Sequence, residues 1–365
     1  MQSALPIGSG KRLQFIDNAR GIAILLMLEG HFVGLTLAPE WRVENNVIYE
    51  IWNYIRGITG PMFLFVTGLV FSYLLTGSKE TNWWQMRRVR RGLLRVLELL
   101  FWGYLLQFNF INLPAILSGK PDVWLQAFHV LQCIAIGLFV MIFSFICLRK
   151  LPLPVLMGCY VLLALSCFFG HVWLSHQQGF FPNQAWAWVQ NMWKGPNSIF
   201  PIAPWLGFTF YGAALGVMIR WHSGKIPLLK WMVCGVILIL AGSLLDVVLG
   251  QALMHASGIP YALKTHGFHA HVGDVLMITS VLAWCEIRAW HFPAALQMIG
   301  KNTFFIYVTH VIVLYGAIFG VGLNDWLVNK LNPWQTAFGA IIFCALFAGL
   351  AILLEKRKSR ATTHA

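Results

Sequence analysis

Charged side chains are scarce in this 365-residue chain: aspartate, glutamate, lysine and arginine together make up 11% of it. A soluble domain carries about 25% charged residues. Hydrophobic residues account for 58%, and the mean hydropathy is +0.68. These values exclude a water-soluble globular protein. They predict an all-α polytopic membrane protein, with one transmembrane domain at 15–355, a cytoplasmic segment at 1–14 and a cytoplasmic tail at 356–365.

Cysteines at metal-ligand spacing are also missing. The seven cysteines all lie in apolar stretches, so we expect neither disulfides nor a metal ion. His266, His269 and His271 could bring two metal ligands together, but the sequence secures no third. A cleaved signal is not expected either, because Lys11 and Arg12 precede an apolar run that is interrupted by charges and lacks a small-residue cleavage pattern.

Long apolar runs are abundant, and they give the predicted topology. Windows of about 20 apolar residues mark about ten transmembrane helices. They lie near 15–37, 58–76, 92–113, 125–148, 152–173, 199–220, 228–250, 268–289, 302–323 and 335–355. An even number of crossings places both termini on the same side of the membrane.

The basic residues indicate which side that is. With the N-terminus inside, the inner segments collect twenty of the 26 lysines and arginines and the outer segments six. This asymmetry predicts cytoplasmic N- and C-termini. It also explains the net charge of +13 by contact with lipids of the inner leaflet, without nucleic acid. The expected location is a plasma membrane of the bacterial inner-membrane type.

The first predicted helix carries ionisable residues where a lipid-facing helix has none. At about 100° per residue, Asp17, Arg20 and His31 fall within about 60° of one another, and Arg20 and His31 lie about 16 Å apart along the axis. Glu29 points to the opposite face. Ionisable groups inside a bilayer are expensive and typical of functional sites. The alternative is an arginine that snorkels to the interface and a hydrogen-bonded core histidine.

The same segment reads D-x-x-R-G-x-A-I-L-x-M from Asp17, with ten residues between Arg20 and His31. It resembles the membrane-embedded acyltransferases, a superfamily that holds acyltransferase family 3 and the heparan-α-glucosaminide N-acetyltransferase-like proteins. Three later motifs resemble the same proteins. They are V-L-Q-x-I at 130–134, P-W-L-G-x4-G-x3-G at 204–216 and G-x-N-T-x3-Y-x2-H at 300–310.

The resemblance implies an acyltransferase that uses acetyl-CoA as donor and acts on a carbohydrate or another polyhydroxy acceptor. On the matching motifs it implies substrate-binding roles for Gln132, Trp205, Asn302, Tyr307 and His310. The glycines of the 204–216 motif are also suited to close helix packing. From its position at the outer end of the window 268–289, Asp274 is a further candidate for orienting a substrate or another histidine.

A basic cluster precedes the third predicted helix. Arg87, Arg88, Arg90, Arg91 and Arg95 fall within nine residues on the predicted inner side. Arginine binds phosphate bidentately, and coenzyme A carries three phosphates, so the cluster is a candidate donor site. Its Arg-x-x-Arg pairs also resemble a signature of the acyltransferases. The alternative is a topology determinant that contacts lipid headgroups.

His31 is the candidate catalytic group, with Arg20 and Asp17 beside it, because no serine or cysteine stands in a nucleophile setting. It would act as general base in direct transfer or carry the acyl group in two steps, and the sequence leaves both open. A proton- or anion-coupled transporter could use the same intramembrane charges, but no paired repeats support one. A non-catalytic scaffold would leave these charges unexplained. An oligomer is possible.

Overall fold

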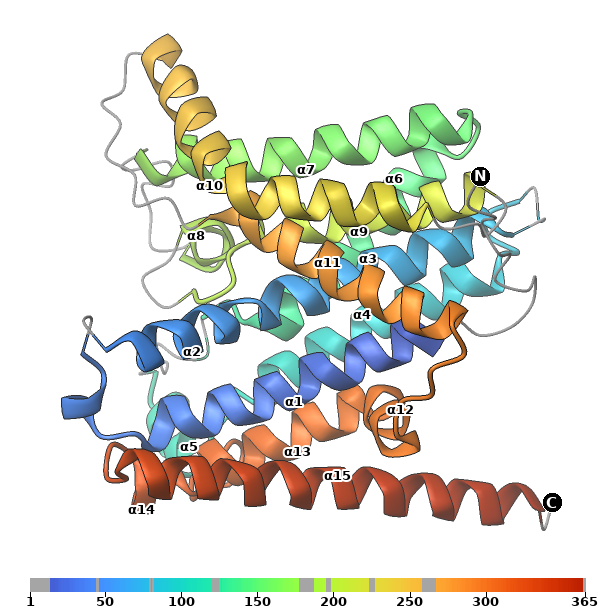
Figure 1. The fold of residues 1–365 in the computed structure, drawn as a ribbon. Helices are drawn as coiled ribbons and strands as arrows, with labels where there is room; N and C mark the ends of the chain where they lie inside the picture. Colours follow the sequence, from blue (N-terminus) through green and yellow to red (C-terminus); the bar gives the residue numbers. More distant parts are fainter. Residues whose placement is uncertain are drawn as a thin grey trace. The chain divides into compact units, whose positions relative to one another are not determined.

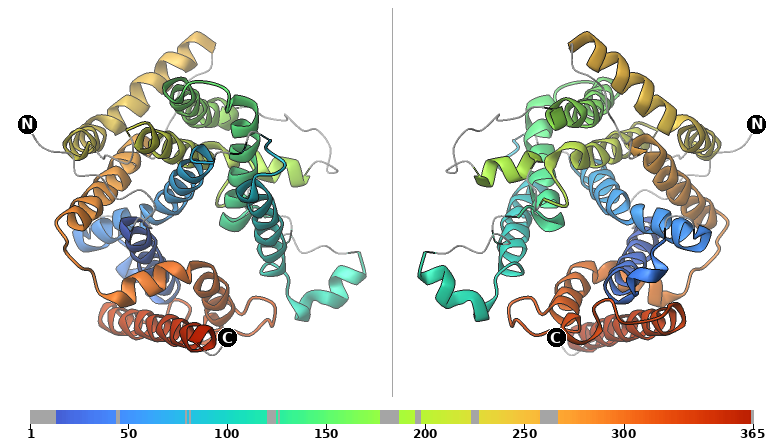
Figure 2. Two further views of the ribbon diagram at one scale, coloured as in Figure 1. Left: turned by 90° about the vertical axis from the view of Figure 1, so that its right-hand side faces the viewer. Right: turned by 90° about the vertical axis from the view of Figure 1, so that its left-hand side faces the viewer.

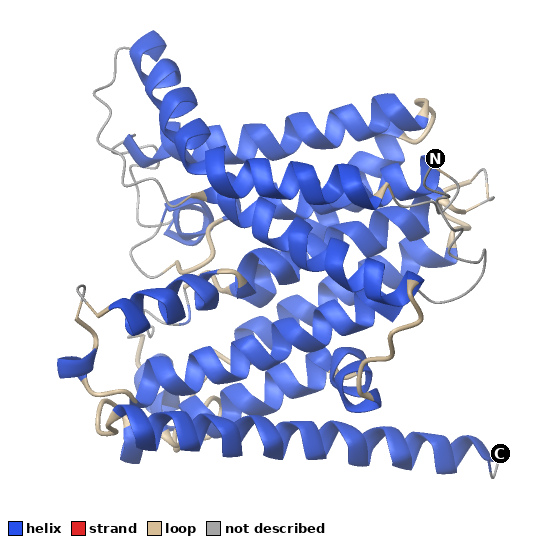
Figure 3. Cartoon of the chain, viewed as in Figure 1, coloured by secondary structure: helices blue, strands red, loops and turns tan. Residues whose placement is uncertain are grey.

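The computed structural model describes residues 14–43, 46–78, 80, 82–119, 125, 127–176, 187–194, 198–222, 227–257 and 267–363. Within these residues every regular element is a helix and no strand is formed (Figure 3). This confirms the predicted all-α class. The helices are α1 (Gln14–Thr36), η1 (Pro39–Trp41), α2 (Val47–Gly57), α3 (Thr59–Thr76), α4 (Arg87–Leu105), η2 (Phe110–Asn112), α5 (Leu113–Leu117), α6 (Val130–Leu148), α7 (Leu153–His176), α8 (Ala187–Lys194), α9 (Ile202–Trp221), α10 (Leu228–Ser257), α11 (Phe268–Ile287), α12 (Ala294–Lys301), α13 (Thr303–Tyr315), α14 (Asn324–Leu327) and α15 (Pro333–Thr363).

Each of the ten predicted windows coincides with a helix. In the described part of the chain, eight helical spans are long and apolar enough to cross a membrane, and α2 and α3 together form one of them. If the bent pair α12 and α13 is counted as one further span, the described residues contain nine. The remaining window, near 92–113, corresponds to α4, whose 19 residues include five arginines and a glutamate.

The chain divides into two compact units, and each is described by itself. Unit 1 contains 60–104 and 121–287, with α3, α4 and α6 to α11. Unit 2 contains 13–59, 105–120 and 288–365, with α1, α2, α5 and α12 to α15.

In unit 1, glycines bring α3 and α9 into backbone contact. A Cβ at Gly68 would collide with the carbonyl oxygen of Thr209, and a Cβ at Gly212 would collide with that of Phe65. The hydroxyl of Ser72 donates to the carbonyl oxygen of Ala213 at 2.7 Å across the same interface. Close approach through small residues is the usual way for helices to associate in a membrane. The packing role predicted for the glycines of the 204–216 motif is thus confirmed at Gly212.

In unit 2, α1 packs against α12, α13 and α15 (Figures 1 and 2). Gly300 of α12 sits against the backbone of Asp17, and Gly21 of α1 sits against the backbone of Leu296. The chain bends by 78° between α12 and α13. α13 then ends at Tyr315, well before the predicted 323, because Gly316 takes the left-handed conformation (φ +67°) that closes a helix. α15 instead continues to Thr363, through the segment predicted as a separate tail.

Candidate active site

His31 lies on α1 in unit 2 and is hydrogen-bonded to His310 on α13. The Nδ1 atom of His31 is 3.1 Å from the Nε2 atom of His310. The ring of His31 is half-buried, whereas His310 has no exposed surface. Two residues that the sequence placed 279 positions apart are therefore one polar group inside an apolar bundle.

The hydrogen bonds assign the tautomers of both rings. The Nδ1 atom of His310 is 3.2 Å from the carbonyl oxygen of Ile306, and a carbonyl can only accept. In neutral His310 the proton is therefore on Nδ1 and Nε2 is an acceptor. His31 must then donate from its own Nδ1, which leaves the lone pair on its Nε2. Among the described residues the Nε2 atom of His31 has no hydrogen-bond partner.

Two tyrosines of α13 flank the histidines. The ring of Tyr307 meets His310 edge-on at a centroid distance of 5.2 Å, and Tyr315 meets His31 edge-on at 5.9 Å. Of the predicted site residues, the structure thus brings His31, His310 and Tyr307 together. Asp17 and Arg20 lie on the same helix as His31 but do not reach it. Along the helix axis Arg20 is about 16 Å from His31, and Asp17 is further away.

Arg56 of α2 is a member of this site that the sequence analysis missed. Its side chain lies against Gly30 and Gly34, which precede and follow His31 in the sequence. A Cβ at Gly30 would be 3.0 Å from the Cγ atom of Arg56, and a Cβ at Gly34 would be 3.4 Å from its Cζ atom. Its guanidinium acts electrostatically on His31 and on Tyr315. The available signal was a single arginine in the last turn of α2, directly before the long apolar run of α3.

Glu29 and Trp52 support Arg56 from the other side. The indole N–H of Trp52 donates to the Glu29 carboxylate at 2.6 Å. The Cζ atom of Arg56 then lies 5.5 Å from the centroid of the Trp52 ring, which is a cation–π geometry. The role of Glu29 is thus to orient Trp52, on a face of α1 different from the one that meets His310.

Asn302 is engaged at the bend between α12 and α13 and does not reach the histidines. Its amide nitrogen donates to the Glu355 carboxylate at 2.9 Å, and its amide oxygen accepts from the Lys358 ammonium at 2.8 Å. Lys358 and Glu355 also form an ion pair at 2.9 Å. The geometry gives Asn302 a bracing role toward α15.

The other predicted substrate residues lie in unit 1. Gln132 is fully buried on α6, against Gly103 of α4. Trp205 of α9 packs on Phe200 with ring centroids 4.5 Å apart. Asp274 of α11 accepts a hydrogen bond from the Nδ1 atom of His271 at 3.1 Å.

Unit 1 contains a polar cluster of Asp246, His269 and Tyr211 that the sequence analysis did not predict. His269 pairs through Nδ1 with the Asp246 carboxylate, which also accepts from the backbone N–H of His269 at 3.0 Å. The Nε2 atom of His269 is 3.1 Å from the hydroxyl of Tyr211. Asp246 therefore joins α10 to the first turn of α11, where backbone N–H groups need acceptors.

The arginine cluster divides into engaged and unengaged members. Arg95 pairs with Glu98 at 2.6 Å, and Arg88 donates to the carbonyl oxygen of Leu74. The side chains of Arg87, Arg90 and Arg91 are exposed and make no hydrogen bond or ion pair to a described residue. At 100° per residue these three span about 100° of the α4 surface. We refer to Arg87, Arg90 and Arg91 as the arginine face.

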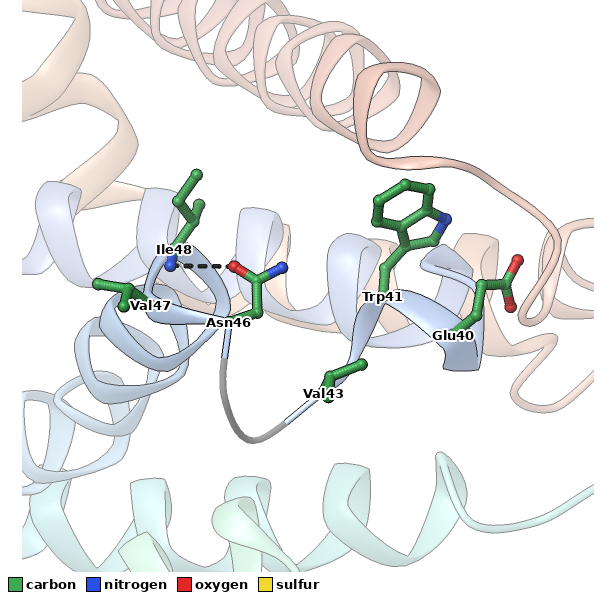
Figure 4. A pocket seen from close by; sticks show the side chains of 6 residues that line it. All are labelled: Glu40, Trp41, Val43, Asn46, Val47 and Ile48. Carbon is green, nitrogen blue, oxygen red and sulfur yellow. Dashed lines mark hydrogen bonds between the residues drawn. The ribbon is translucent and has the colours of Figure 1, made fainter.

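No group of three or more His, Cys, Asp or Glu is placed to hold a metal ion in the part of the chain that the structure describes. His266 lies outside the described residues, so the histidine group considered from the sequence is represented by His269 and His271 alone. An open pocket in the connection between α1 and α2 is lined by Glu40, Trp41, Val43, Asn46, Val47 and Ile48 (Figure 4). Its only titratable lining group is Glu40.

The helices and the site define a polytopic membrane protein with a histidine pair inside its transmembrane bundle. The chain belongs to the heparan-alpha-glucosaminide N-acetyltransferase, catalytic, family, whose model matches residues 12–258. This confirms the resemblance found in the sequence and supports a membrane-bound acetyltransferase. The matched residues include His31, Arg56 and the arginine cluster, whereas His310 lies beyond them. A comparison with curated proteins finds no match.

Proposed function

We propose that this protein transfers an acetyl group from acetyl-CoA to a hydroxyl or amine of a carbohydrate-type acceptor, with His31 as general base. The observation that carries the proposal is the hydrogen bond from His31 to His310. It fixes His31 in the tautomer whose Nε2 can take a proton. The family supports acetyl transfer, and the two histidines provide the acid–base group that such a transfer requires.

In the direct form of the reaction, the acceptor oxygen or nitrogen attacks the thioester carbonyl while Nε2 of His31 takes the acceptor's proton. The resulting imidazolium is stabilised because its Nδ1–H still donates to His310. Collapse of the tetrahedral intermediate breaks the carbon–sulfur bond. The proton on His31 then passes to the leaving thiolate, which restores neutral His31 and releases coenzyme A.

The function is tested with the purified chain in detergent. Without an acceptor, water should replace it slowly, so free thiol should be released from acetyl-CoA in the presence of the protein. The release is measured with a thiol reagent. Protein that neither binds acetyl-CoA nor releases its thiol would contradict the proposal.

We infer that the arginine face holds donor phosphates, because three exposed guanidinium groups within one arc of α4 suit a phosphate-rich ligand. The triple substitution of Arg87, Arg90 and Arg91 by glutamine should raise the KM for acetyl-CoA by about tenfold or more, since charge-assisted hydrogen bonds contribute about 1.5–3 kcal/mol each. A phosphate-free acetyl thioester is the control substrate, and its KM should not change. Exposed apolar residues continue the same face, namely Leu94, Leu97 and Phe101. If the triple variant and the unsubstituted protein have the same KM for acetyl-CoA, the result would contradict a donor site and favour lipid headgroups as the ligand.

We further propose that both termini are cytoplasmic, as the asymmetry of basic residues indicates. Cysteines introduced at the exposed positions Glu40 and Ser118 should react with a membrane-impermeant maleimide added outside intact cells. Cysteines at Glu80 and His222 should react only after the membrane is opened. The reverse pattern would invert the orientation and place the arginine face on the outer side, away from cytosolic acetyl-CoA.

A further inference from the structure

The side chain of Arg56 lies along α1, over Gly30 and Gly34. Its stem lies against Gly30 and its guanidinium against Gly34, one helical turn further along, and His31 belongs to that turn. A Cβ at Gly30 would be 3.0 Å from the Cγ atom of Arg56, which is a tight contact, whereas a Cβ at Gly34 would be 3.4 Å from its Cζ atom, an ordinary van der Waals distance. The sequence G-H-x-x-G thus places an arginine along the flank of His31.

The guanidinium keeps its hydrogen-bonding capacity. Arginine has five N–H donors in a fork. Arg56 makes no hydrogen bond to any described residue, and its contacts are the stacking on Trp52 and electrostatic interactions with Glu29, His31 and Tyr315. The side chain of Arg56 is exposed, and its contacts with Trp52, Gly30 and Gly34 place it along α1, so its donors are available to a ligand beside His31.

We propose that Arg56 is a catalytic residue that stabilises the oxyanion of the acetyl-transfer intermediate; this inference rests on the proposed role of His31. When the acceptor attacks the thioester, the carbonyl π-electrons move to oxygen and create a negative charge that is absent from the substrate. Donors that are fixed before the reaction stabilise such a charge most strongly. On collapse the charge returns to form the carbonyl and leaves with the thiolate, so Arg56 itself is unchanged.

The geometry separates this role from that of His31. His31 takes and returns the proton through Nε2, and His310 holds the opposite nitrogen. Arg56 comes from a different helix, α2, and its guanidinium stacks on Trp52, which is hydrogen-bonded to Glu29. Because the two groups make different contacts, each can be substituted by itself and its contribution measured separately.

The test uses the full chain in detergent with acetyl-CoA as donor and thiol release as the measurement. Arg56→Gln should lower kcat by on the order of 10²–10³-fold, the usual cost of losing an oxyanion donor, with a smaller change in KM. Arg56→Ala should recover part of its rate when guanidinium chloride is added, whereas His31→Ala should not. Arg357→Gln is the matched control: Arg357 is exposed on α15 of the same unit and makes no hydrogen bond to a described residue, so kcat should stay within twofold.

The outcomes distinguish this inference from the proposed function. If His31→Gln is inactive while Arg56→Gln keeps a normal kcat, the oxyanion role is wrong and the role of His31 stands. A raised KM with normal kcat would also overturn it, because it would make Arg56 a ground-state binding group. If His31→Gln is active, the proposed function itself fails. Should the glutamine and alanine variants fail to elute as a single species, Arg56→Lys carries the test, because it keeps the stem and charge but loses the fork.

Discussion

His31→Gln is expected to abolish acetyl transfer. Glutamine keeps a polar group of similar reach, so the amide nitrogen can still donate to Nε2 of His310. It cannot take a proton from the acceptor, however, and loss of general-base catalysis costs about 10²–10⁴-fold in rate. Binding of acetyl-CoA should persist. The measurements are single-turnover transfer and equilibrium binding of acetyl-CoA to the purified protein.

His291→Gln is the matched control for that experiment, because His291 is an exposed histidine of the same unit. It should leave both rate and binding unchanged. Near-normal turnover in His31→Gln would contradict a catalytic role and leave His31 with a structural one. Labelled acetyl-CoA given without acceptor then separates the two mechanisms, since an acyl-enzyme that is sensitive to hydroxylamine and lost in His31→Ala would select the two-step route.

His310→Phe is expected to lower kcat by on the order of 10²-fold while the protein still folds. Phenylalanine fills the buried site but offers no acceptor, so Nδ1–H of His31 loses its partner and the ring is no longer held in one orientation. Small errors in catalytic geometry have effects of this size. Leaving that N–H unpaired also costs about 1–3 kcal/mol of stability, which a thermal unfolding curve would record.

His310→Gln should recover part of the lost rate, because its amide oxygen can accept from His31. A merely structural role for His310 predicts instead that the glutamine and phenylalanine variants lose stability without this difference in kcat. Thr309→Val is the neighbouring control. Its hydroxyl donates only within α13, to the carbonyl oxygens of Phe305 at 2.8 Å and of Ile306 at 3.2 Å, so its removal should change neither rate nor stability appreciably.

The fold was accessible from the sequence wherever a single physical rule decides it. Twenty apolar residues predict a span, and α1 matches its predicted bounds within one residue at each end. The end of α13 was missed because the apolar run continues past it, and the left-handed turn at Gly316 is a backbone property that hydropathy does not report. The start of α4 was missed for the opposite reason. Its first turns are charged, so the apolar window begins only at residue 92, although the helix begins at Arg87 and its buried residues recur at regular helical spacing.

The site was accessible only in part, for a related reason. Intramembrane ionisable residues mark His31 and His310 individually, but the pairing between helices depends on packing. Arg56 could not be linked to His31 from spacing, because the link is the space left by Gly30 and Gly34. Asn302 was assigned to the substrate on its motif, while the structure shows its amide satisfied by Glu355 and Lys358.

The hydrogen bonds of Asn302 to Glu355 and Lys358 also connect the start of α13 to α15. Asn302 stands at the bend, eight residues before His310, and a slip of one residue would turn α13 by about 100° and shift it by about 1.5 Å. Such a turn would point the imidazole of His310 away from α1. The hydrogen bonds between the buried amide of Asn302 and the carboxylate and ammonium groups of α15 therefore oppose a rotation that would separate His310 from His31.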